Sequence, residues 1–190
     1  MITVDLSEPP SYEERVMVDS LRDACRHDGA HVDPWGLLGL LRIEEGLGVP
    51  EHARGLLGAV WCVEAGLRTE TRAGGPIRGD WREGVAMAHG PMQLWPSTVI
   101  ACRAQEGAAD SLEFSARCWI ARIVATLPKA RRLCPDGDSW AVAEAAVSNV
   151  RKYQWRCDAR SQHWRVMEAA QAAPLVAHGD IPDLDAEVPF

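Results

Sequence analysis

The sequence of 190 residues lacks a long apolar stretch, and no run reaches the roughly 18 residues that a membrane-spanning helix needs. Its first 20 residues lack the basic and apolar segments of a secretory signal peptide. Positive charge is also in deficit, because 27 acidic residues outnumber 20 Lys and Arg and leave a net charge of −7. We therefore expect no membrane span and no nucleic-acid partner.

Cysteine pairs at metal-binding spacing are missing as well. The six cysteines form no C-x-x-C motif, so neither zinc nor another cofactor is expected. Cys62 and Cys118 fall on apolar helical faces, which predicts small core residues. Cys134 and Cys157 flank a predicted helix, and they could pair if the protein meets an oxidising compartment.

Phe and Tyr are scarce, with two each, whereas there are eight Trp residues. An indole ring offers a flat apolar face and one donor, which suits sugar binding, although most Trp side chains are expected in the core. Runs rich in Ala and Leu, with few β-branched clusters, favour helices. The length and the 47% hydrophobic content are typical of one globular domain with a substantial core.

Apolar periodicity predicts a mostly α domain over residues 12–173, between a lead at residues 1–11 and an acidic tail at residues 174–190. Ser11 and Asp33 are predicted helix N-caps, and Asp110 or Ser111 a third. The expected helices are 12–27, 35–47, 50–64, 96–105, 111–132, 139–152 and 161–172.

A long loop is expected over residues 67–89, where no helical period is visible, and it could contain a short β-hairpin around Gly74 and Gly75. Loops of this length in compact domains are usually functional. Asp80 lies in this loop, where it could pair with an Arg or act as a second carboxylate.

The strongest functional signal is Glu64, which ends the apolar helix 50–64. The surroundings at the rim of a core disfavour the charged form of a carboxyl group and so raise its pKa. Glu64 could therefore hold a proton near neutral pH, as the acid in glycosidic bond cleavage must. A turn-rich run, Gly-Pro-Met-Gln-Leu-Trp-Pro-Ser-Thr, follows at residues 90–98 and suits a groove for an uncharged polar polymer. Glu44 and Glu45 form a rival helix-end pair, but they lie further from this run. His163, beside Trp164, is expected to be structural.

Glu64 and the later G-x-M-Q-x-x-P-x-T segment together resemble the lysozyme-like lytic transglycosylases that cut peptidoglycan. The resemblance implies a lysozyme-like fold, with Met92, Gln93 and Trp95 in the saccharide groove. It covers roughly residues 33–150 and departs from the family in two places. Ala65 stands where the family has Ser after the Glu. Ser148 replaces a Tyr in the family's Ala-Tyr-Asn triplet, which leaves Asn149, and Tyr153 beyond it, as the expected substrate-binding residues there.

The resemblance implies cleavage of the β-1,4 bond between N-acetylmuramic acid and N-acetylglucosamine. Glu64 would protonate the bridging oxygen and then take the proton of the muramoyl 6-hydroxyl, leaving a 1,6-anhydro end without metal or water. A muramidase that uses Asp80 as its base is the enzymatic alternative. The third possibility is a catalytically inactive domain that binds wall glycans or a protein.

The expected partner is the peptidoglycan glycan strand, and the protein is expected to be a monomer. A wall-cleaving enzyme with no visible export signal would fit a phage lysin or a virion protein that reaches the bacterial cell wall by another route.

Overall fold

The computed structural model describes residues 7–25, 33–65, 81–82, 85–86, 90–102, 111–148 and 155–173. Helices dominate these residues, which confirms the mostly α prediction. They are α1 Tyr12–Ala24, α2 Pro34–Gly46, α3 Leu56–Ala65, α4 Pro96–Ala101, α5 Leu112–Leu133, α6 Ser139–Ser148 and α7 Gln162–Gln171. A short 3-10 helix, η1 (Glu51–Ala53), precedes α3, and two strands, β1 (Trp81–Arg82) and β2 (Val85–Ala86), pair antiparallel.

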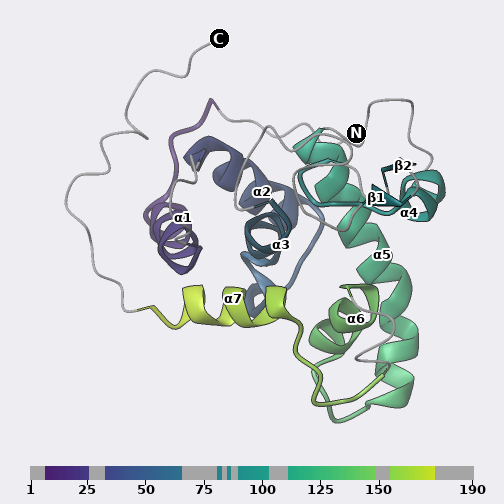
Figure 1. Cartoon of the computed structure of the whole chain (residues 1–190). Coiled ribbons are helices and arrows are strands. Elements are labelled where there is room, and N and C mark those ends of the chain that lie inside the picture. The colour runs from purple at the N-terminus through teal and green to yellow at the C-terminus, as the bar shows by residue number, and fades with distance from the viewer. Residues whose placement is uncertain are drawn as a thin grey trace.

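Helix α3 is the central element of the fold. It contacts α2 on one side and α7 on another, and α7 also packs along α1 (Figure 1). The long helix α5 packs against α2 and α6. Every residue from 55 to 62 is buried, and solvent exposure begins only at Val63 and Glu64. The apolar sequence of α3 is therefore explained by its position inside the helical assembly.

The predicted N-caps are confirmed. Ser11 forms a capping box with Glu14, whose carboxylate accepts a hydrogen bond from the Ser11 N–H while Ser11 Oγ accepts one from the Glu14 N–H. Asp33 accepts from the N–H of Trp35, and Ser111 from that of Phe114. These bonds satisfy donors that the first turn of a helix leaves free.

The prediction of a single helix over residues 50–64 is wrong, because the helical conformation is interrupted at Gly55. Gly55 has φ of +90°, and a Cβ atom there would lie 3.2 Å from Met17 Sδ. α3 therefore starts inside the core, where the N–H groups of its first turn have no partner within the helix. Both oxygens of the buried Glu44 accept from these donors, at 2.6 Å from the N–H of Gly55 and of Leu57.

Three disulfides tie the helices together. Cys134 and Cys157, whose pairing the sequence left open, are bonded, and the bond links the end of α5 to the segment before α7. Cys62 and Cys118 are buried as expected, but the prediction that they are only small core residues is wrong. Cys62 is bonded to Cys25 at the end of α1, and Cys118 is bonded to Cys102 at the end of α4. Each bond joins segments that are separate in the sequence.

Several predicted features can be compared only in part. The hairpin expected around Gly74 and Gly75 falls outside the described residues, and the observed strand pair lies later in the same loop, at residues 81–86. α4 and α6 begin where predicted, and their predicted ends also fall outside the described segments. Among the described helices, none combines the length and the apolar character needed to cross a membrane.

Candidate functional site

Glu64 lies in the last turn of α3, where the buried helix reaches solvent. Its side chain is 28% exposed, in contrast to residues 56–62 of the same helix, which are buried. The carboxylate Oε1 lies 2.9 Å from Nε2 of His163, 99 residues further along the chain. Glu64 is therefore a carboxyl group held by a specific partner at the edge of the core.

His163 enters the site from the first turn of α7. Ser161 caps this helix, with its Oγ accepting from the N–H of Trp164 at 2.9 Å, and this bond fixes the start of the helix. The imidazole is 5% exposed, and the ring of Trp119 from α5 meets it edge-on, with 5.5 Å between the ring centroids. His163 is thus enclosed on one side by an aromatic ring.

Glu144 completes the site from α6. Its side chain has no exposed surface, and its Oε1 lies 2.8 Å from Nδ1 of His163. Its Oε2 has no hydrogen-bond partner among the described residues. Burying a carboxylate costs free energy unless a cation or hydrogen-bond donors accompany it. The burial of Glu144 therefore depends on its contact with the His163 imidazole.

The three side chains form a hydrogen-bonded series, Glu64–His163–Glu144, in which the two carboxylates determine the charge of the imidazole. Burial lowers the pKa of His163, but the hydrogen bonds and negative charges of Glu144 and Glu64 outweigh it and raise this pKa from 6.5 to about 9. At neutral pH His163 is therefore an imidazolium that donates from Nδ1 to Glu144 and from Nε2 to Glu64.

The exposed fraction of the side chain decreases along this series, from 28% at Glu64 to 5% at His163 and none at Glu144. Glu64 is the member that a substrate can reach. The arrangement can donate a proton to a bound molecule, or take one from it, at a single carboxyl group on the protein surface. Among the described residues, no group of three or more His, Cys, Asp or Glu side chains is arranged to hold a metal ion.

The Met-Gln segment forms a tight turn in which Gln93 N donates to Gly90 O at 3.0 Å. Met92 is fully buried, so it supports the turn from the core. Gln93 is 6% exposed, adopts the left-handed conformation with φ of +46°, and donates from Nε2 to Gly90 O. Its Oε1 has no hydrogen-bond partner in the part of the chain that the structure describes. Trp95, in contrast, is 52% exposed, and among the side chains described in this segment it is the one that could contact a ligand.

The other predicted site residues are placed as follows. Asp80, Asn149 and Tyr153 lie outside the described residues. Glu44 uses both carboxylate oxygens to cap α3, and burial raises its pKa to about 8 although the two N–H donors oppose this. Glu45 is exposed. Of the helix-end acids considered, Glu64 is the one held by an ionisable partner.

Sequence reasoning missed His163 and Glu144 as site residues. The signal for Glu144 was its position in the apolar helix α6, where most neighbouring residues are Ala or Val and a buried carboxylate needs a cation. The partner could not be chosen from spacing, because Glu144 and His163 are 19 positions apart in the sequence and belong to different helices.

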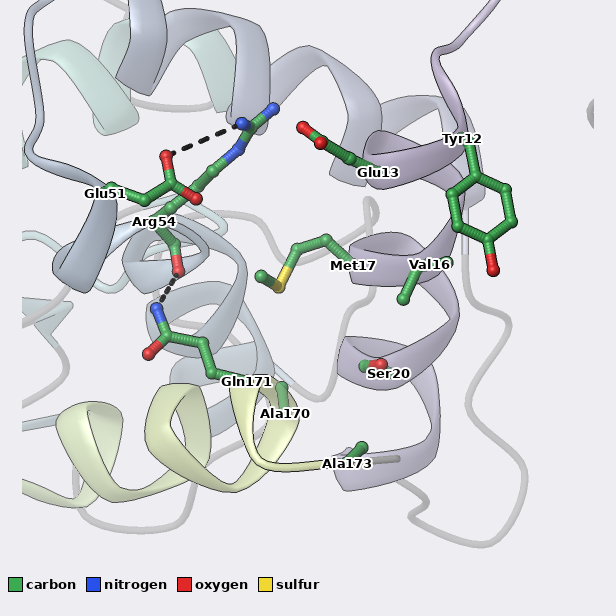
Figure 2. A pocket seen from close by; sticks show the side chains of 10 residues that line it. All are labelled: Tyr12, Glu13, Val16, Met17, Ser20, Glu51, Arg54, Ala170, Gln171 and Ala173. Carbon is green, nitrogen blue, oxygen red and sulfur yellow. Dashed lines mark hydrogen bonds and ion pairs between the residues drawn. The ribbon is translucent and has the colours of Figure 1, made fainter. Parts of the chain in front are cut away.

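A groove of about 570 Å³ lies elsewhere, between α1, η1 and the C-terminal end of α7 (Figure 2). Met17 points into it, while Glu51 and Arg54 form an ion pair at 3.8 Å on the η1 side of the groove. Gln171 also lines it, and lies about 12 Å along α7 from His163 at 1.5 Å per residue. The groove contains none of the predicted site residues.

No family model matches the chain, and no curated protein or solved structure is significantly similar to it. Function is therefore inferred from the side chains of the site.

Proposed function

We propose that the chain is a lysozyme-like lytic transglycosylase that cleaves the β-1,4 bond between N-acetylmuramic acid and N-acetylglucosamine in peptidoglycan. The observation that carries this proposal is the position of Glu64, a partly exposed carboxyl at the end of the buried helix α3, with a single ionisable partner behind it. Such a group can act as an acid and then as a base without a metal.

Glu64 would first give a proton to the bridging oxygen, which breaks the glycosidic bond. The resulting carboxylate would then remove the proton of the muramoyl 6-hydroxyl, whose oxygen closes the 1,6-anhydro ring. One surface carboxyl is enough for both steps. Glu144, with no exposed surface, cannot activate a water molecule for hydrolysis.

The remaining features are consistent with an enzyme that acts at the bacterial cell wall. The exposed indole of Trp95 offers a flat surface for a sugar ring, on a turn that the buried Met92 anchors. Three disulfides favour work in an oxidising compartment, such as the bacterial cell envelope.

Purified peptidoglycan incubated with the wild-type chain, with Glu64→Gln and with Glu45→Gln provides the test. Glu64→Gln should lower the cleavage rate at least about a hundredfold, the scale for a lost general acid, because an amide cannot donate the proton. Glu45→Gln is the matched control, since Glu45 is an exposed acid at the end of α2, and its activity should equal that of the wild type. Full activity of Glu64→Gln would contradict the proposal.

The products identify the reaction type. Mass spectrometry of the released muropeptides should find 1,6-anhydro ends. Reducing ends would instead identify a muramidase, which needs a second carboxylate such as Asp80. Binding of chitooligosaccharides with no cleavage at all would identify an inactive glycan-binding domain.

A further inference from the structure

We infer that His163 and Glu144 are positioning residues that store the working proton of Glu64, so that the three side chains act as one relay. This inference rests on the proposed acid and base role of Glu64. It assigns a function to a histidine and a buried carboxylate that a single-carboxylate mechanism does not require.

The first step is the hydrogen-bond geometry. His163 Nε2 lies 2.9 Å from Glu64 Oε1, and Nδ1 lies 2.8 Å from Glu144 Oε1, so each ring nitrogen has one carboxylate partner. These distances are those of charge-assisted hydrogen bonds. A proton on Nε2 therefore lies on a direct line to the carboxyl group that the substrate can reach.

The second step is the number of protons. With His163 charged, the relay holds two ring protons and a net charge of −1. Transfer from Nε2 to Glu64 Oε1 breaks an N–H bond, forms an O–H bond and leaves the same net charge. His163 is then a neutral ring with its remaining proton on Nδ1, the tautomer that Glu144 stabilises by accepting from it.

The third step links this transfer to the two halves of the reaction. When Glu64 gives its proton to the glycosidic oxygen, the relay goes from −1 to −2. When it removes the proton of the 6-hydroxyl, the relay returns to −1 and the proton settles again on Nε2. Atoms and charge balance, and no other reactant is needed.

Burial explains why the stored proton lies on His163 and not on Glu64, the residue that donates it to the substrate. The imidazole is 5% exposed and is covered by Trp119 from α5, so solvent cannot easily exchange its proton or compete for its donors. The charged groups that act on His163 are Glu144 from α6 and Glu64 from α3, and both raise its pKa, to about 9. The relay should therefore stay loaded up to about pH 9.

The test measures the pH dependence of peptidoglycan cleavage for the wild type, Glu144→Gln, His163→Gln and the control His52→Gln. His52 is 55% exposed and pairs with Asp138, which is not a member of the relay. In the wild type the rate should fall on the alkaline side near pH 9. His163→Gln should move this fall by at least about two pH units towards acid, because the variant lacks the imidazolium that keeps the proton at alkaline pH.

Glu144→Gln should give an intermediate shift, since its amide still accepts from Nδ1 but carries no charge. His52→Gln should match the wild type. A uniform loss of rate in His163→Gln with no shift of the alkaline limb would overturn the relay, because a merely structural role lowers the rate equally at every pH.

Nitrogen NMR of the wild-type imidazoles separates this inference from the proposed function and does not depend on whether a variant folds. The His163 signals should show both nitrogens protonated at pH 7.5. If they do and no peptidoglycan is cut, the proposed function fails while the stored proton is upheld. A neutral ring at pH 7.5 would overturn the relay even in an active enzyme.

Discussion

The charge on His163 should appear in the pH dependence of folding stability. The pKa of this imidazole is raised from 6.5 to about 9 in the folded chain. Below pH 6.5 the folded and unfolded chains both hold the proton, so the full stabilisation is present. Between these two values only the folded chain keeps it, and the free energy of unfolding falls as pH rises, until the contribution is lost above about pH 9.

The interval between 6.5 and about 9 corresponds to about 3 kcal/mol, at roughly 1.4 kcal/mol for each pH unit. Solvent screening removes little of this, because the His163 side chain is only 5% exposed. For a chain of this size, the loss is equivalent to a fall in melting temperature of roughly 6–12 °C.

Urea denaturation at pH 6 and pH 10 measures this effect, with Glu144→Gln combined with His163→Gln as the reference chain. His163→Gln alone would leave Glu144 buried and unpaired, which adds a pH dependence of its own. Glu44, whose pKa burial raises to about 8, is present in both chains and cancels. The wild type should lose about 3 kcal/mol more than the reference between the two pH values. Equal losses would show that the folded chain holds no extra proton on His163.

Two structural predictions concern α3. Glu44→Gln should cost about 1–3 kcal/mol in urea denaturation, because one of the two N–H donors at the start of α3 faces an NH₂ group in place of an oxygen; a cost equal to that of the exposed Glu45→Gln would refute this. Cys25→Ser with Cys62→Ser should cost about 3–4 kcal/mol, since the bond closes a loop with a sequence separation of 37, and an unchanged melting temperature would contradict it.

Local signals predicted much of the fold. Ser11, Asp33 and Ser111 cap helices as expected because an N-cap depends on a few neighbouring residues. The break at Gly55 was missed, although a glycine is the residue that a left-handed turn favours. Apolar periodicity continues through this position and hides it, since both sides of the break face the same core.

Of the three residues of the site, only the partly exposed Glu64 could be predicted from the sequence. Glu64 stands out because it follows an apolar run at a helix end, which is a local pattern. His163 and Glu144 are brought together by the packing of α3, α6 and α7, and no spacing in the sequence encodes that contact. The same reason hid the Cys25–Cys62 and Cys102–Cys118 bonds, whose partners belong to different helices.

The ends of two helices meet at the relay, and their dipoles favour movement of the proton towards Glu64. Glu64 lies at the C-terminal end of α3, where the partial negative charge of the helix opposes a carboxylate. His163 lies in the first turn of α7, where the partial positive charge opposes an imidazolium. Each effect is typically worth 0.3–1 kcal/mol, and both decrease when the proton passes from Nε2 to Oε1. Glu144 opposes them by holding the positive charge on the ring.

This opposition has a physical consequence for the proposed chemistry. With Glu144 alone, the proton would remain on His163 and the surface carboxyl would stay charged, a poor acid. Without the two carboxylates, burial would lower the pKa of His163 and favour its neutral form. The two influences act in opposite directions on one proton, and a bound substrate that shields Glu64 from solvent would add a further bias towards Glu64. Desolvation supplies it, since burying the carboxylate end favours the transfer that makes Glu64 neutral. On this reasoning substrate binding itself would move the proton to the group that uses it.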